Sequence, residues 1–226
     1  MFRDASQRIL LRSLTLKTNV KETHILLEES PHFASYITRL VIERDATSIK
    51  SQYRSVEQVL SKLTNVRYCI MMGTFASQQN PTFTSTLLDF LAREPLRELT
   101  VISGDAVPPA IILHLITAAP IITFALASLR KDPIMLSDEN TGPQPPRVED
   151  LSYQWNGKLY GRALRLLAQP QFKSYTSTLR RLFISFFPDT NTGVKLLLAT
   201  APQLEHLHLE GLGSLMNPPA LPAPLS

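Results

Sequence analysis

The chain has 226 residues, enough for one ordinary domain or one elongated repeat domain. Hydrophobic residues make up 44% and charged residues 19%, which permits a substantial core and argues against wholesale disorder. The formal net charge is +4, but the longest basic runs are the pairs Arg130-Lys131 and Arg180-Arg181, so we expect a solvated surface and no nucleic-acid site.

Cysteine usage and hydrophobic stretches indicate where the protein resides. The single cysteine, Cys69, excludes an internal disulfide and a multi-thiolate metal site, and it fits a reducing compartment. The first residues interleave charged and apolar side chains, unlike a signal peptide. The most apolar stretch, 106–129, contains Pro108, Pro109 and Pro120 and is too interrupted for a membrane span. We therefore expect an intracellular protein, cytoplasmic or nuclear, without a membrane partner.

An apolar triplet with the spacing Φ-x-x-Φ-x-Φ recurs eight times, and each copy predicts one short strand. In chain order the copies are Leu11/Leu14/Leu16, Ile37/Leu40/Ile42, Val66/Cys69/Met71, Leu96/Leu99/Val101, Ile121/Phe124/Leu126, Val148/Leu151/Tyr153, Leu179/Leu182/Ile184 and Leu204/Leu207/Leu209. Their first residues lie 25 to 31 positions apart. This is close to the period of about 20–29 residues that marks leucine-rich repeats.

Short amphipathic helices are predicted between the triplets. They cover residues 20–29, 53–63, 83–93, 110–119, 158–168 and 193–201. Several of them end before a proline that introduces the next strand, since proline disfavours helix at the preceding residue. These prolines are Pro31, Pro95, Pro120 and Pro202.

This alternation predicts an α/β fold, a right-handed leucine-rich-repeat-like solenoid of about eight strand–helix repeats with a parallel sheet on its concave face. We expect the solenoid to cover residues 1–216, with a loop at 130–147 in place of one helix and a disordered proline-rich tail at 217–226. An asparagine follows the triplet in only two copies, at Asn19 and Asn156, so the repeats should be irregular.

A binding surface is predicted on the inner face of the sheet. The fourth and sixth triplet positions should face the helices, so the third and fifth should face outward, including Thr123 and Ala125 in the fifth copy. The mixture of aromatic, apolar and arginine side chains there resembles a protein-binding hot spot, although such residues could equally pack only against their cross-strand neighbours. The candidate residues are Arg39, Tyr68, Ile70, Glu98, Asp150, Arg181, Phe183, His206 and His208.

No catalytic, metal or cofactor site emerges from the residues. His206 and His208 should face the same side of a strand, but a closed zinc site needs more ligands than these two. Cys69 occupies a core position, where a thiol behaves as a small hydrophobe. There is no G-x-S-x-G nucleophile elbow, P-loop or dinucleotide-binding glycine pattern. We therefore expect neither an enzyme nor a cofactor.

Several passages are similar to those of fungal F-box proteins with degenerate leucine-rich repeats. These passages are residues 12–16, 26–33 leading to 36–40, 60–67 and 201–209. The resemblance implies that the repeats capture a protein for a cullin–RING ubiquitin ligase of the SCF type, while an F-box binds the ligase adaptor. The first predicted strand begins at about Arg8, so we expect no F-box in this chain, and the adaptor could bind only if an F-box exists upstream.

Three functional hypotheses follow. The first is a protein-binding repeat scaffold, the substrate-recognition part of such a ligase receptor without its F-box. The alternative is an α/β enzyme, hydrolase-like or nucleotide-dependent, since alternating strands and helices also suit a doubly wound sheet. A weaker third hypothesis is nucleic-acid binding through scattered basic residues.

Overall fold

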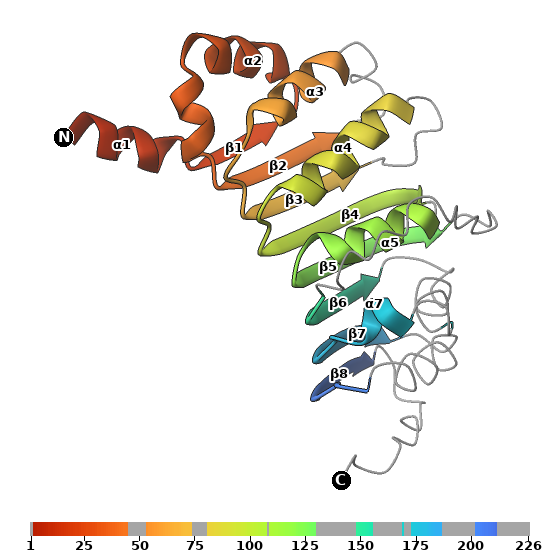
Figure 1. The fold of residues 1–226 in the computed structure, drawn as a ribbon. Coiled ribbons are helices and arrows are strands. Elements are labelled where there is room, and N and C mark those ends of the chain that lie inside the picture. Colours follow the sequence, from red (N-terminus) through yellow and green to blue (C-terminus); the bar gives the residue numbers. More distant parts are fainter. Residues whose placement is uncertain are drawn as a thin grey trace.

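A single parallel sheet organises the protein. The computed structural model describes residues 2–44, 53–73, 81–107, 109–129, 148–155, 169, 173–186 and 202–211. Its eight strands are hydrogen-bonded in chain order, and every neighbouring pair is parallel (Figure 1). The strands are β1 (Ser13–Leu16), β2 (Arg39–Arg44), β3 (Tyr68–Gly73), β4 (Glu98–Val107), β5 (Ile121–Leu129), β6 (Asp150–Trp155), β7 (Arg181–Phe186) and β8 (His206–Gly211). The predicted α/β class and parallel sheet are confirmed.

The helices that follow the strands lie on one face of the sheet. The helical elements are α1 (Phe2–Leu10), α2 (Val20–Glu29), the 3₁₀ helix η1 (Pro31–Tyr36), α3 (Tyr53–Lys62), α4 (Pro81–Arg93), α5 (Pro109–Ala118) and α7 (Lys173–Thr176). Figure 1 shows α2, α3, α4, α5 and α7 covering the same side, while α1 projects beside the β1 end. Apart from the end of α1 beside the first strands, the described helices leave the opposite face uncovered.

The core lies between the strands and these helices. Residues at alternate strand positions point to opposite faces. In the central strands, the residues at the fourth and sixth triplet positions point toward the helices, as predicted, and are buried. Examples are Leu40, Leu99 and Ile184, all fully buried. At the first and last strands, which have a neighbouring strand on one side alone, the inward residues Leu14 and Leu207 are only half-buried, although Leu16 of β1 is buried.

A ladder of shared carbonyl groups runs along the starts of the strands. The carbonyl oxygen of Arg12 accepts the backbone N–H groups of both Thr38 and Arg39, each at 3.0 Å. The same two-to-one pattern recurs in the following units, where the accepting residues are Thr38, Arg67, Pro120, Glu149 and Arg180. The carbonyl of Arg97 receives one such bond, from Ile121 at 3.3 Å, because the preceding residue is proline and has no N–H.

This ladder and the strand register correct the fifth triplet. We predicted Ile121/Phe124/Leu126, but Ile121 pairs with Glu98 and Ile122 pairs with Leu99. The inward triplet of this unit is therefore Ala119/Ile122/Phe124, and all three residues are buried, while Ile121 is 40% exposed. A shift of two residues leaves each strand residue on the same face, so hydrophobic alternation alone could not distinguish the two registers.

The N-terminal region also departs from the prediction. Residues 2–10 form helix α1, whereas we expected a strand from about Arg8; the first strand begins only at Ser13. Pro31 opens the 3₁₀ helix η1 instead of a strand, since proline is well suited to the first turn of a helix. Asn19 is exposed just before α2, where its Oδ1 accepts the N–H of Lys17 at 3.2 Å.

The other predicted helices fall into two groups. Helix α2 has the predicted bounds, and the bounds of α3, α4 and α5 differ from the prediction by one or two residues. Boundaries of this kind are the least certain part of a helix assignment. Four predicted segments lie outside the described residues. They are the helices at 158–168 and 193–201, the loop at 130–147 and the tail at 217–226.

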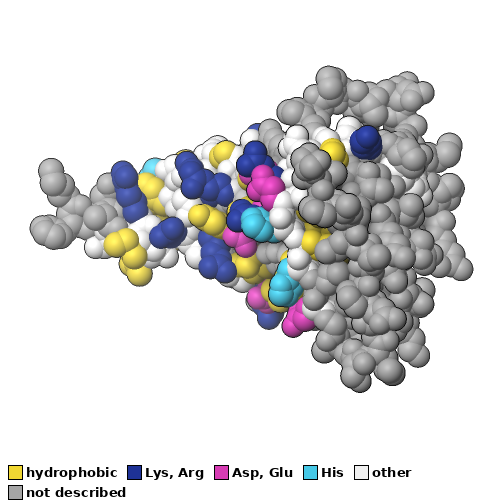
Figure 2. Space-filling model, turned by 90° about the horizontal axis from the view of Figure 1, so that it is seen from below, with side chains coloured by type: hydrophobic (Ala, Val, Ile, Leu, Met, Phe, Trp, Pro, Cys, Tyr) yellow, Lys and Arg dark blue, Asp and Glu magenta, His cyan; other side chains and the backbone are white. Residues whose placement is uncertain are grey.

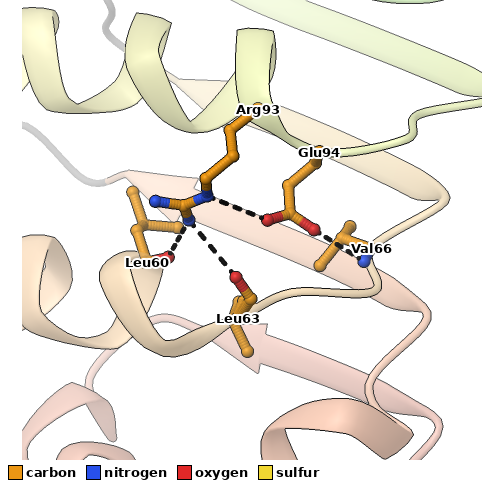
Figure 3. A network of polar contacts seen from close by, with 5 residues as sticks. All are labelled: Leu60, Leu63, Val66, Arg93 and Glu94. Atoms are coloured by element: carbon orange, nitrogen blue, oxygen red, sulfur yellow. Dashed lines mark hydrogen bonds and ion pairs between the residues drawn. The ribbon is translucent and has the colours of Figure 1, made fainter.

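A buried carboxylate joins α4 to the preceding unit (Figure 3). Glu94 is 2% exposed, and its Oε2 accepts the backbone N–H of Val66 at 3.0 Å. Its Oε1 lies 3.3 Å from Nε of Arg93. The guanidinium of Arg93 also donates to the carbonyls of Leu60 and Leu63, at 2.8 and 3.2 Å. The two carbonyls lie at the C-terminal end of α3, where they lack helical partners. Arg93 and Glu94, at the end of α4, therefore hydrogen-bond to backbone groups of the preceding strand–helix unit.

A second ionic contact, between α2 and α3, is exposed. Nζ of Lys62 lies 2.6 Å from Oε1 of Glu28. The hydrogen bond and the charge of Lys62 hold the pKa of Glu28 below its ordinary value. Exposed pairs of this kind add little to stability, so we assign the larger structural role to the contacts of the buried Glu94 carboxylate.

We expect Glu94→Ala to lower the free energy of unfolding by about 1–3 kcal/mol, because it leaves the buried N–H of Val66 without an acceptor. Urea denaturation followed by circular dichroism measures this loss. The matched control is Glu29→Ala, at an exposed position on α2, which should leave the urea midpoint nearly unchanged. Equal effects of the two substitutions would contradict a structural role for Glu94.

The register of β5 is tested by two adjacent isoleucines. Ile122→Ala should cost about 2–5 kcal/mol of stability, because it opens a cavity in the core. Ile121→Ala should cost about 1 kcal/mol or less, because that side chain is partly exposed. The same denaturation measurement applies to both, and a larger loss for Ile121→Ala would show that the register is wrong.

Candidate functional site on the open face of the sheet

The face of the sheet away from the helices, which we call the open face, is the candidate site. The structure brings all nine predicted residues onto it, each exposed or half-buried: Arg39, Tyr68, Ile70, Glu98, Asp150, Arg181, Phe183, His206 and His208. In the fifth unit the corresponding positions are Ile121 and Thr123, and not Thr123 and Ala125 as predicted, because of the register correction. The open face is therefore a continuous set of side chains from eight adjacent strands.

The C-terminal half of the open face holds a hollow of about 700 Å³, lined mainly by residues of β5 to β8. Here Arg181 and Asp150 form a two-pronged ion pair across neighbouring strands, with Nε to Oδ1 at 2.6 Å and Nη2 to Oδ2 at 2.5 Å. The hydrogen bond and charge of Asp150 raise the pKa of Arg181 above its ordinary value. This geometry fixes the guanidinium and largely offsets its charge.

Two aromatic side chains of the same hollow are paired with each other. The rings of Phe183 and His208 are stacked, with centroids 4.7 Å apart and an angle of 8° between their planes. The two residues are also direct partners in the register of β7 and β8. They therefore form one flat aromatic surface, and some of the predicted contact residues do pack on cross-strand neighbours.

The N-terminal half holds a second hollow of about 630 Å³. Its floor and walls come from β1 to β4, and include Arg12, Arg39, Tyr68, Ile70 and Glu98. Its remaining wall comes from α1, whose Ile9 and Leu10 are 76% and 78% exposed. The sequence interpretation missed these two residues because it placed a strand where the helix lies. The charged and apolar residues of 2–10 also fit a helical period, and this pattern could have predicted helix α1.

The remaining chemical candidates do not assemble into a reactive centre. Cys69 lies beneath the N-terminal hollow and is 1% exposed. Burial raises the pKa of this thiol to about 12, so it is protonated and unreactive near neutral pH. Among the residues that the structure describes, no three His, Cys, Asp or Glu side chains lie close enough together to hold a metal ion.

Comparison with known proteins adds no family to these observations. No protein-family model matches the chain, and no curated protein matches it either. Within the described ranges, no helix has the length and apolar character needed to cross a membrane. Helix α5, the most apolar, has 10 residues, half of the roughly 20 that a membrane span requires.

The burial of Cys69 has a direct chemical consequence. In the folded protein at pH 8, iodoacetamide should leave the thiol almost unmodified, because the raised pKa and the lack of exposure both oppose attack. In denaturing urea the same reagent should modify it fully, since the unfolded thiol regains its ordinary pKa. Mass spectrometry measures both extents, and rapid modification of the folded protein would show that Cys69 is accessible.

Proposed function

We propose that this chain is a leucine-rich-repeat-like solenoid that acts as a protein-binding scaffold through the open face of its sheet. The observation that carries this proposal is the uncovered face itself. It combines Tyr68, Ile70 and Phe183 with Arg39 and Arg181, residue types that dominate binding energy in protein interfaces. The strands follow one another in chain order, which supports a repeat architecture over a doubly wound sheet, where the order reverses.

The size and shape of the open face favour a macromolecular ligand. Eight strands spaced about 4.8 Å apart give a face roughly 34 Å long, comparable with one side of a standard protein interface. Its two hollows are open to solvent and lie over different strands. A small-molecule site instead encloses most of its ligand and converges a few polar groups on it.

We further propose that the captured protein is a substrate of an SCF-type cullin–RING ubiquitin ligase, and that the chain has no catalytic activity of its own and needs no cofactor. This assignment is supported by the resemblance of four passages to fungal F-box proteins with leucine-rich repeats. In such a receptor the ligase adaptor binds an F-box, so adaptor binding here requires an F-box encoded upstream. The repeat units would then supply substrate recognition alone.

Site-specific photo-crosslinking tests the binding face. A benzophenone amino acid replaces Tyr68 or Phe183 on the open face, or exposed Arg54 on α3, and each protein is irradiated in an extract of the source cells. We expect the two open-face positions to give the same crosslinked protein, identified by mass spectrometry, and Arg54 to give none of it. The reverse pattern would contradict the proposal.

A charge-reversed protein provides the matched control. Arg39→Glu, Asp150→Lys and Arg181→Glu together should abolish the open-face crosslink, because they change the charge pattern that the partner meets. The last two changes exchange the members of an ion pair and so preserve it. Unfolding midpoints should therefore match those of the unchanged protein. Loss of the crosslink accompanied by unfolding would show that these residues have a structural role instead.

A further inference from the structure

Arginines from separate units gather at the N-terminal starts of the first four strands. Arg12, Arg67 and Arg97 each lie just before a strand, and Arg39 begins β2. Backbone bonds place them together, since the carbonyl of Arg12 accepts the N–H of Arg39, and the carbonyl of Arg67 accepts that of Arg97 at 2.8 Å. Figure 2 shows Lys and Arg side chains concentrated on its left, the side of α1 and the strand starts. No basic run in the sequence reveals this cluster, because the repeat period separates its members.

These arginines have no internal counter-charge. In the part of the chain that the structure describes, the side chains of Arg12, Arg39, Arg67 and Arg97 form no ion pair, in contrast to Arg181, which is held by Asp150. Among residues 11–13, 37–39, 66–68 and 96–98, Glu98 is the only carboxylate. Four guanidinium groups without an ion pair therefore lie at these strand starts beside one carboxylate. Two of them, Arg12 and Arg39, line the N-terminal hollow of the open face.

The same place exposes apolar surface. Ile9 and Leu10 of α1 stand over the N-terminal hollow, and Tyr68 and Ile70 line it from β3. Helix α1 is attached to the body in part by Arg8, whose guanidinium lies 5.2 Å from the ring centre of Tyr36. Exposed apolar side chains grouped beside unpaired charges are typical of an interaction site.

We propose that this end of the open face binds an acidic peptide segment of the partner, with one apolar side chain in the hollow and carboxylates on Arg12 and Arg39, which line it. The proposal rests on the proposed protein-binding function and specifies its ligand. Carboxylates bind guanidinium groups through two parallel hydrogen bonds. The starts of β1 to β4 span about 14 Å, the length of about four extended residues, so a short peptide is long enough to cross the hollow and contact both Arg12 and Arg39.

Charge and polarity both favour a peptide over a nucleic acid. Beside Arg12 and Arg39, the hollow is lined by the apolar side chains of Ile9, Leu10 and Ile70, which suit an apolar peptide side chain and not a phosphate group. Farther along the same edge, the starts of β6 to β8 carry Glu149, Asp150 and Glu205 beside Arg180 and Arg181, and Asp150 is already paired with Arg181. The excess of positive charge therefore does not continue past the fourth strand, where a longer phosphate backbone would need it.

Fluorescence anisotropy with a defined probe tests the proposal. The probe is a labelled peptide with a central Leu-Phe pair flanked by glutamates, and it is compared with the same peptide carrying lysines instead. We expect the acidic peptide to bind, the lysine peptide not to bind, and the affinity to fall as salt is raised, because the charges are exposed. A single-stranded RNA that competes as well as the acidic peptide would overturn the proposal in favour of nucleic-acid binding.

Two matched variants locate the site. Arg12→Glu combined with Arg39→Glu should weaken the acidic peptide by about tenfold or more. Arg54→Glu combined with Arg180→Glu, at two exposed positions outside the hollow, changes the net charge by the same amount and should leave the affinity unchanged. Equal weakening by both variants would mean that only net charge matters and would refute a specific site. A remaining outcome is that two copies of the chain associate through the apolar hollow, which sedimentation measurements would detect. If this self-association prevented peptide binding, it would also refute the proposal.

The result separates this inference from the proposed function. If the acidic peptide fails to bind while Phe183 in the C-terminal half still crosslinks one protein, the open face binds proteins but the acidic-peptide assignment is wrong. If neither position crosslinks and the peptide fails as well, the protein-binding function is wrong.

Discussion

The fold depends on burial that no single strand–helix unit can complete alone. Each strand turns alternate side chains toward the helices. Leu40 and Leu99, in strands with two neighbours, are fully buried, whereas Leu14 and Leu207 in the outermost strands are half-buried. The shared carbonyls at the strand starts keep the units in register, because the N–H groups of each unit are satisfied by its predecessor. Each strand therefore depends on the strands beside it for both burial and backbone hydrogen bonds.

The same constraint creates the open face and its unequal halves. Because these helices all lie on one side of the sheet, the strand side chains that point to the other side do not pack against them. Those side chains can therefore differ from one strand to the next. In the C-terminal half the charges and aromatic rings pair internally, as in Asp150 with Arg181 and Phe183 with His208. In the N-terminal half the arginines stay unpaired beside exposed Ile9 and Leu10. Under the proposed protein-binding function, these unpaired groups are the ones that a partner would contact.

The sequence predicted which strand residues are buried and which lie on the open face, because hydrophobic alternation indicates directly which residues face the core. It failed where a different physical rule decides. The register of β5 depends on a backbone ladder that tolerates Pro120, and a shift of two residues leaves the hydrophobic pattern unchanged. The arginine cluster escaped notice because Arg12, Arg39, Arg67 and Arg97 are distant in sequence and meet only through stacking. Helix α1 was missed, and with it one wall of the N-terminal hollow.

Hydroxyl-radical footprinting of the protein, alone and with its crosslinked partner bound, tests the central claim most directly. The account predicts that Tyr68, Phe183 and His208 are oxidised in the free protein and protected in the complex. His114, exposed on α5 on the helical side, should be oxidised equally in both states. Protection of His114 with unchanged oxidation of the open-face side chains would contradict the account, because the partner would then bind the helices.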